Sequence, residues 1–412
     1  MTQASATFTP ALRRSILLLS FATFASMAAQ RICDAMLPEL ARAFSVSLAE
    51  AASVVSVFAV TYGLSQLVYG PLGDRLGKFG VVTWGTLACS GGCLLAMFAG
   101  SLDVLVLARI LTALGAATII PLSMAWIGDE VAYEMRQETL ARVGLGTTLG
   151  IVGGQLFGGL LTDTLGWRWA FGFLALLFGV VGTLLAADRR NHPGAVKLPG
   201  AAADERPGFA RQAVLILTGP WSRVVLAVAL IEGAAGFGVL AIWASHLNQT
   251  LGLSLTSAGA IVALFGLGGM LYMAAARHMI RRWGERALVL WGGGLFAASA
   301  CAVGLTPLWW PAIPASLLAG FGFFMFHNTM QAHATQMAPD ARGTGVSLFA
   351  SALFLGQSVG VVFAAGFINR IGSRAVIALA AVTFFALAVF FAQALQRRDR
   401  ARAARAADAS TI

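Results

Sequence analysis

The chain has 412 residues, of which 58% are hydrophobic and only 11% are charged, a composition far from that of a soluble domain. Roughly a dozen apolar runs, each near the ~20 residues that cross a bilayer, fill this length and leave no room for a sizeable soluble domain. The net charge of +10 lies in short clusters between these runs, so it indicates membrane orientation and argues against nucleic-acid binding.

The apolar runs predict an all-α polytopic membrane protein with twelve transmembrane helices. The predicted spans are 13–40, 50–71, 79–100, 103–127, 139–162, 168–187, 222–246, 255–276, 286–306, 310–335, 343–368 and 374–396. Segment 188–221 contains Pro193, Pro199 and Pro207 and many hydrophilic residues, so it is predicted to link the two halves. The domains expected are therefore an N-terminal six-helix bundle (1–187), a cytoplasmic linker (188–221), a C-terminal six-helix bundle (222–396) and a basic tail (397–412).

The basic residues predict the orientation of the chain. An even number of spans places both termini on one side of the membrane. If that side is the cytoplasm, all of the 28 lysines and arginines face the cytoplasm except four on the outside (Arg42, Arg168, Arg370, Arg374) and two within spans (Arg31, Arg109). The positive-inside rule therefore predicts cytoplasmic termini, and a bacterial inner membrane is the expected location.

The first span carries a polar face. Met27, Gln30 and Asp34 follow helical spacing, and Arg31 lies three residues before Asp34. In an otherwise apolar helix, such a face is expected to line a cavity and not to face lipid.

The loop after the second span reads Gly70-Pro-Leu-Gly-Asp-Arg-Leu-Gly-Lys78. Gly70, Gly73 and Gly77 permit a tight turn. Arg75 and Lys78 hold the loop on the cytoplasmic side. The alternative is a solvated turn with ordinary surface charges.

The fourth span contains Arg109 within the membrane. Such an arginine costs about 2.5–3.5 kcal/mol on insertion scales and needs a partner or a wet cavity. Counted from the outer helix ends, Arg109 and Asp34 lie at about the same depth, so Asp34 is the predicted partner. Snorkelling of Arg109 to the outer interface is the alternative.

Glycines recur through the fifth span, with Gly150, Gly154, Gly158 and Gly159 spaced so that a neighbouring backbone can approach closely. They are predicted to pack helices together. This packing role alone would account for the pattern.

Only two acidic residues, Asp34 and Glu232, lie well inside spans, and Glu232 lies near mid-bilayer in the seventh. Removing a carboxyl group from water favours its neutral form, so such a group can load and release a proton. We expect Asp34 and Glu232 to carry proton coupling, and Arg109 and Arg31 to tune them. Static salt bridges between the bundles are the alternative.

The tenth span brings aromatic and hydrogen-bonding side chains together. With Met27 and Gln30, it predicts a substrate cavity lined by Phe323, His327, Asn328 and Gln331. Structural polar packing explains this segment equally well. No metal site is expected, because no cysteine or carboxylate joins the histidines, and the four cysteines lie singly in apolar segments.

The two halves resemble each other at an offset of 206 residues. Five pairs match: Arg136 with Arg342, Gly150 with Gly356, Gly154 with Gly360, Gly166 with Gly372, and Arg168 with Arg374. One further residue of shift pairs Gly77 with Gly284. Because each half has six spans, both enter the membrane in the same direction, so the repeat is parallel and two pseudo-symmetric bundles are expected.

Three segments carry a resemblance to a known family. The loop 70–78, Arg109 with its small residues and Pro121, and the glycine-rich fifth span are similar to motifs of the major facilitator superfamily. Leu37-Pro38 resembles the end of the first helix in its drug:proton antiporter branch. The resemblance implies that Gly70, Gly73, Asp74, Arg75, Gly77 and Lys78 form a latch of one conformation, in which Asp74 braces the start of the eleventh helix at Gly343–Gly345. Gln155 departs from the antiporter motif, which usually has proline there.

The resemblance implies a secondary active transporter that exports a small organic solute in exchange for protons by alternating access. Proton-coupled uptake or facilitated diffusion of a metabolite is the alternative that Gln155 keeps open, and a non-transporting sensor or scaffold is the alternative from another class. An enzyme is not expected. No cofactor is expected either, because the proton gradient supplies the energy and no nucleotide-binding pattern is present. The lipid bilayer, protons and the solute are the expected partners, and the protein is expected to be a monomer.

Overall fold

The computed structural model describes residues 9–189 and 209–410, so 190–208 of the predicted linker lie outside it. All regular elements of this part are helices. The first seven are α1 (Pro10–Ala43), α2 (Leu48–Ala51), α3 (Ser53–Leu76), α4 (Lys78–Met97), α5 (Leu102–Glu130), α6 (Tyr133–Thr164) and α7 (Trp167–Asp188). The others are α8 (Phe209–Thr218), α9 (Pro220–Glu232), the π-helix η3 (Gly233–Gly238), α10 (Val239–Leu251), α11 (Leu255–Leu305), α12 (Ala312–Gln336), the 3₁₀-helix η4 (Pro339–Ala341) and α13 (Arg342–Ser410).

Within the described ranges, nine helical segments are long and apolar enough to cross a membrane. Two of them, α11 with 51 residues and α13 with 69, exceed one crossing, because about 20 helical residues span the hydrocarbon core. Each reverses at a glycine with positive φ, Gly284 in α11 (+73°) and Gly372 in α13 (+81°), so each supplies two crossings. With α12, which has 25 residues, the predicted twelve spans and all-α fold are confirmed.

The internal repeat is visible in the backbone of the turns. The first half turns at Gly77 (φ 86°, ψ 118°) and Gly166 (φ 94°, ψ 153°). Their sequence counterparts, Gly284 (φ 73°, ψ 166°) and Gly372 (φ 81°, ψ 155°), turn in the same region of φ and ψ. Residues with a Cβ rarely adopt this region, which explains why glycine recurs at matching positions of both halves.

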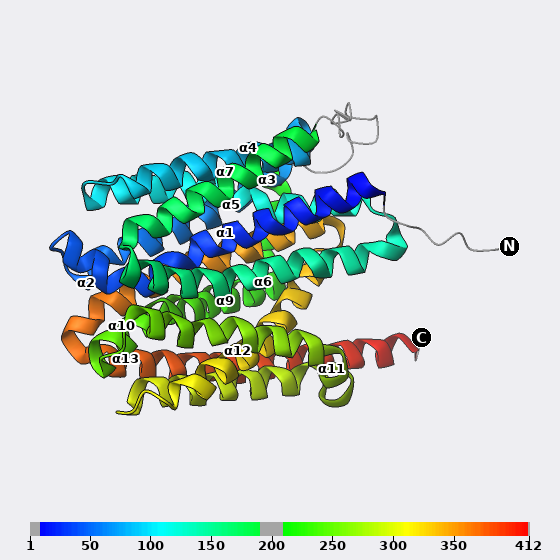
Figure 1. Ribbon diagram of the computed structural model, residues 1–412. Coiled ribbons are helices and arrows are strands. Elements are labelled where there is room, and N and C mark those ends of the chain that lie inside the picture. The colour runs from blue at the N-terminus through cyan, green and yellow to red at the C-terminus, as the bar shows by residue number, and fades with distance from the viewer. Residues whose placement is uncertain (1–8, 190–208, 411–412) are drawn as a thin grey trace.

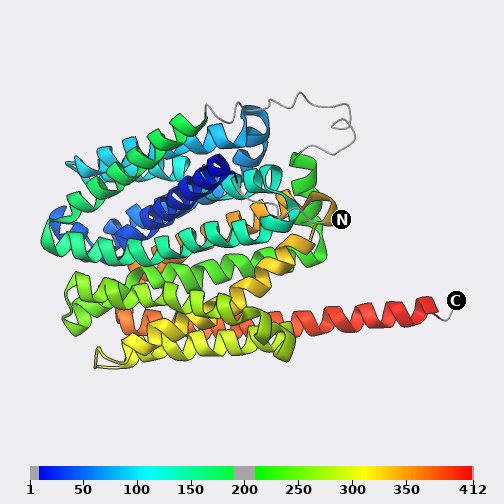
Figure 2. The same cartoon turned by 45° about the vertical axis from the view of Figure 1, so that its right-hand side comes forward.

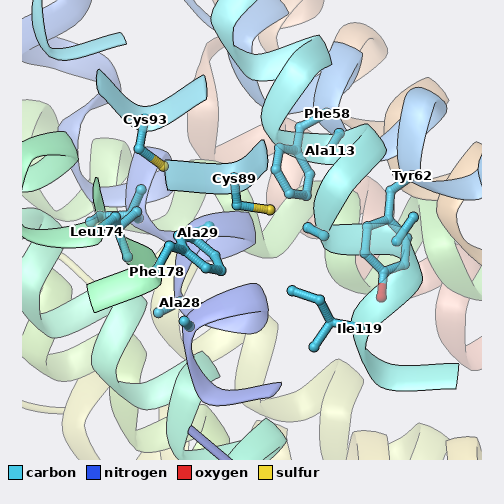
Figure 3. Packing of buried hydrophobic residues seen from close by; sticks show 14 of the residues in the cluster. Ala28, Ala29, Phe58, Tyr62, Cys89, Cys93, Ala113, Ile119, Leu174 and Phe178 are labelled. Atoms are coloured by element: carbon cyan, nitrogen blue, oxygen red, sulfur yellow. The ribbon is translucent and has the colours of Figure 1, made fainter. Parts of the chain in front are cut away.

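Each half has its own hydrophobic core. One cluster runs from Ile16 to Leu185 and includes only three residues of the second half, and the other runs from Val225 to Leu395 with Ala35 of α1. In Figure 3, Cys89 and Cys93 lie in the first cluster beside alanine, leucine and aromatic side chains. Three of the four cysteines are buried and Cys301 is half-buried, so they serve as small core residues.

The two halves lie side by side, with the first half above the second in Figure 1. Figure 2 shows the same order and the end of α13 extending beyond the bundle. The starts of α1 and α9, the Gly77 and Gly284 turns and the end of α13 share one end of the molecule, here called the basic end. The opposite end, with the Gly166 and Gly372 turns, is called the far end.

Contacts between the halves run from the far end to the middle of the molecule. At the far end, the Asp163 carboxylate accepts hydrogen bonds from the backbone N–H and the hydroxyl of Thr256, both at 2.6 Å. In the middle, the Ser351 hydroxyl donates to the carbonyl of Gly63 at 2.7 Å. These contacts join α6 to α11 and α3 to α13.

Candidate functional site

Asp34 is fully buried on α1 and is held by two donors. Its Oδ2 accepts a hydrogen bond from Gln155 Nε2 at 2.8 Å and lies 3.5 Å from Arg31 Nη1. Its Oδ1 has no hydrogen-bond partner among the residues that the structure describes. Gln155, which departs from the antiporter motif, therefore contacts the carboxylate that the sequence assigns to proton coupling.

Arg109 is buried on α5 and has other partners than the predicted one. Its Nη1 donates to the carbonyl of Ala29 at 2.7 Å, and its Nε donates to the carbonyl of Val54 at 3.1 Å. Its guanidinium carbon lies 4.1 Å from the centre of the Phe58 ring. The structure thus corrects the predicted direct Asp34–Arg109 pair, because Arg31 and Gln155 bind Asp34. Arg109 instead ties α5 to α1 and α3 through backbone oxygens.

Glu232 is the corresponding buried carboxylate of the second half. Its Oε1 lies 2.7 Å from Nδ1 of His327 on α12, and its Oε2 has no hydrogen-bond partner within the described part of the chain. Glu232 is the last residue of α9, directly before the π-helix η3. Single π-turns inside α-helices are rare and occur frequently at functional sites. The sequence singled out both residues, but not their pairing.

Phe237 of η3 links the two sets of residues across the interface between the halves. Arg31 of the first half lies with its guanidinium carbon 4.3 Å from the centre of the Phe237 ring. The same ring is 6.4 Å from the His327 ring, centre to centre. Sequence reasoning missed Phe237; the only signal was an aromatic residue among the glycines that follow Glu232. We call Asp34, Gln155, Arg31, Phe237, His327 and Glu232 the central network.

The predicted substrate-cavity residues do not all join this network. Phe323 is buried and stacks on His327, with ring centres 5.6 Å apart and planes at 12°. Gln30 donates from Nε2 to Oε1 of Gln357 at 3.3 Å, which connects α1 to α13. Met27 is buried, whereas Asn328 is half-buried and Gln331 is exposed. Gln357 was missed as a partner.

The glycines of α6 lie against two different helices. Methyl groups at Gly150, Gly154 and Gly158 would collide with the backbone carbonyls of Phe24, Ala28 and Ile32 on α1, whereas one at Gly159 would collide with Leu255 of α11. The repeat shows the same arrangement in the second half, where Gly356 and Gly360 lie against the carbonyls of Leu230 and Ala234. The four glycines therefore permit close packing both within the first half and between the halves.

The predicted latch residues are not engaged with α13 in this structure. Asp74 has a 69% exposed side chain and lies 3.3 Å from Lys78 Nζ, which also contacts Asp129 at 2.6 Å. A Cβ on Gly343 would meet no atom within 4 Å. Gly70 and Gly77 likewise face open space, whereas Gly73 packs on the side chain of Leu122. The side chain of Arg75 is exposed. The structure therefore shows a conformation in which Asp74 does not brace the start of α13.

The sequence matches the Major Facilitator Superfamily model over residues 19–360 and 225–411. A chloramphenicol resistance protein of Pseudomonas aeruginosa is 28% identical, over 72% of this chain and 70% of its own. A multidrug resistance protein B homolog of Mycobacterium tuberculosis is also 28% identical, over 70% of this chain and 63% of its own. The fold matches the inward-facing, unoccupied structure of a bacterial homolog of the human lysosomal transporter Spinster, with a TM-score of 0.77, 18% identity and 94% and 98% of the two chains covered. The chain therefore belongs to the Major Facilitator Superfamily of membrane carriers.

Proposed function

We propose that this carrier exports small organic solutes in exchange for protons, by alternating access between its two halves. The observation that carries the proposal is the central network. It holds one buried carboxylate in each half and joins them across the interface through the Arg31–Phe237 contact. A change in the charge of either carboxylate therefore alters the contact between the halves.

Proton coupling is supported by the partners of the two carboxylates. A proton on Asp34 weakens its attraction to Arg31, which frees the guanidinium to move relative to Phe237. A proton on Glu232 neutralises its pairing with His327, whose ring stacks on Phe323. Solute binding near these aromatic rings and proton binding would thus compete for the same set of side chains, so that bound solute favours proton release.

Export of an organic solute is supported by the relatives and by the aromatic side chains. Two relatives are named for chloramphenicol or multidrug resistance. Around the central network, Phe237 and Phe323 lie 4.5 Å apart between ring centres, and Phe265 lies 5.4 Å from Phe323. An apolar, aromatic surface with few polar groups suits a lipophilic ligand. We therefore infer that the solute is lipophilic and that Met27, Gln30, Asn328 and Gln331 contact it.

We also propose a location and an orientation for the protein. We infer that the protein is a monomer of a bacterial inner membrane with the basic end in the cytoplasm, because the arginine-rich turns lie at that end. Asp74 would then contact Gly343–Gly345 when the cytoplasmic side closes.

The proposal is tested by substrate-induced proton movement in proteoliposomes. Lipophilic cations, antibiotics and small metabolites are screened against an imposed pH gradient, using the wild type, Asp34→Asn and Glu232→Gln. We expect at least one compound to release protons from the wild type and from neither variant. Solute movement without any proton movement in the wild type would refute proton coupling and leave facilitated diffusion. Unchanged coupling in both variants would refute the assignment of these carboxylates.

A further inference from the structure

A cavity of about 430 Å³ lies at the basic end, between the start of α9 and the last membrane turns of α13. Trp221 and Val224 form its α9 side, and Phe390 and Ala394 form its α13 side. Arg397 and Arg398 also line it. None of these residues belongs to the central network, so the cavity is separate from the proposed transport site.

The structure holds Arg398 in a fixed position beside this cavity. Its guanidinium carbon lies 4.2 Å from the centre of the Trp221 ring, and its Nη1 lies 3.2 Å from Nδ1 of His333 on α12. His333 in turn lies with Nε2 3.0 Å from the carboxylate of Glu285, beside the Gly284 turn. Arg398 thereby joins the end of α13 to α9 and α12, next to the exposed Arg397.

The position of the cavity along the helices indicates what it binds. Pro220 is the first residue of α9, and Arg397 directly follows the predicted span 374–396. The cavity therefore sits where hydrocarbon gives way to headgroups. Val224, Phe390 and Ala394 give it an apolar side within the predicted spans, and Arg397 and Arg398 give it a basic side just beyond them. Arginine binds phosphate through paired, charge-assisted hydrogen bonds, and basic pockets on the cytoplasmic side of membrane proteins bind anionic lipid headgroups.

We propose that this cavity binds an anionic phospholipid of the surrounding bilayer. An acyl chain lies along Val224, Phe390 and Ala394, and the phosphate contacts Arg397 and Arg398. The bound lipid strengthens the attachment of the end of α13 to α9 and α12. This site does not depend on the transported solute or on proton coupling, so its test is independent of the proposed function.

Native mass spectrometry of the purified full chain tests the site, with phosphatidylglycerol and phosphatidylcholine as the added probes. Arg397→Gln removes an exposed cavity arginine, and Ala394→Phe fills the cavity. Arg223→Gln, an exposed arginine of α9 outside the cavity, and Ala386→Phe, an exposed alanine of α13, are matched controls. We expect phosphatidylglycerol to be retained in preference to phosphatidylcholine, and both cavity variants to lower the retained fraction at least threefold, unlike the controls.

The melting temperature supplies a second measurement on the same proteins. Phosphatidylglycerol should raise it in the wild type and in both controls, and raise it by less than half as much in Arg397→Gln and Ala394→Phe. Equal retention and equal stabilisation in cavity and control variants would show that any anionic lipid acts through general surface charge, and would overturn the site. No preference for phosphatidylglycerol in the wild type would overturn it as well.

Discussion

The two halves share a fold but handle their buried carboxylates differently. In the first half, Asp34 faces Arg31, a group that keeps its positive charge in proteins, and the amide of Gln155. In the second half, Glu232 faces His327, whose ring can exist as a neutral group. Neutralising Asp34 therefore leaves a buried cation without its counter-ion, whereas the Glu232–His327 pair can become neutral as a whole. The comparison teaches that the second half accepts a change of charge at a lower energetic cost.

The largest expected effect is a difference in stability between the two carboxylate variants. Asp34→Asn leaves Arg31 buried and uncompensated, which should lower the free energy of unfolding by roughly 3 kcal/mol or more. Glu232→Gln keeps a hydrogen-bonding group opposite His327, so a loss below about 1.5 kcal/mol is expected. Thermal unfolding of both variants in detergent measures the difference. Equal destabilisation would show that the halves do not differ in the way their pairings suggest.

Replacing Gln155 tests how the first half of the protein holds Asp34. Gln155→Leu removes the 2.8 Å hydrogen bond to Asp34 while keeping a side chain of similar size, and hydrogen bonds to charged groups contribute about 1.5–3 kcal/mol. We expect a lower melting temperature than in the wild type and altered substrate-induced proton movement.

Gln357→Leu is the matched control, because Gln357 is also a buried glutamine but contacts Gln30 and not a carboxylate. Gln357→Leu should lower the melting temperature by less than Gln155→Leu does. If the two leucine variants behave alike, Gln155 acts through packing of α6 and not through Asp34.

Replacing Phe237 tests the Arg31–Phe237 contact, which joins the two halves. Phe237→Leu removes the ring over which Arg31 lies, and a cation–π contact of this kind contributes about 0.5–2 kcal/mol. Because every 1.4 kcal/mol is tenfold, the population of the present conformation should fall about 2- to 30-fold relative to its alternative. Spin-label distances between the two halves measure that population. Phe385→Leu, at an exposed phenylalanine of α13, serves as the control. An unchanged distance distribution would remove Arg31–Phe237 as a link between the halves.

The sequence predicts the helices better than the contacts between them. Apolar run length locates all twelve spans, and the 206-residue offset anticipates the paired turns at Gly166 and Gly372, because both depend on local physical constraints. Depth alone suggested Arg109 as the partner of Asp34. Depth gives the level of a residue within the membrane, but not the direction in which its side chain leaves the helix.

The π-helix explains why the second half of the site was only partly predicted. Phe237 follows Glu232 by five residues, which in an α-helix places the two side chains about 140° apart around the axis. The wider π-turn of η3 reduces that angle, so Phe237 and Glu232 both approach His327. Regular helical spacing therefore does not reveal this grouping. Gln155 is different: it was noticed as a departure from a motif, but its bond to Asp34 depends on how α6 packs on α1.

The smallest expected effect concerns a second carboxylate–histidine pair of the second half, whose carboxylate lies outside the predicted spans. Glu285 lies beside the Gly284 turn, and its hydrogen bond with His333 lowers its pKa below the ordinary value of 4.5. Because the pKa is lower in the folded state, the pair stabilises the protein above about pH 4.5, and this contribution is lost as the pH falls through the lower folded-state pKa. The Glu285 side chain is 50% exposed, so the contribution should stay below about 1 kcal/mol.

Melting temperatures of the wild type and Glu285→Gln, measured from neutral pH down to about pH 3.5, test this behaviour. The wild type should be slightly more stable at neutral pH, and the difference should shrink as the pH falls below about 4.5. A difference that does not change with pH would mean that Glu285 stabilises the turn by packing and not by charge. The same pairing of residue types has a half-exposed carboxylate at Glu285 and a buried one at Glu232, so comparing the two pairs separates what a histidine partner contributes from what burial contributes.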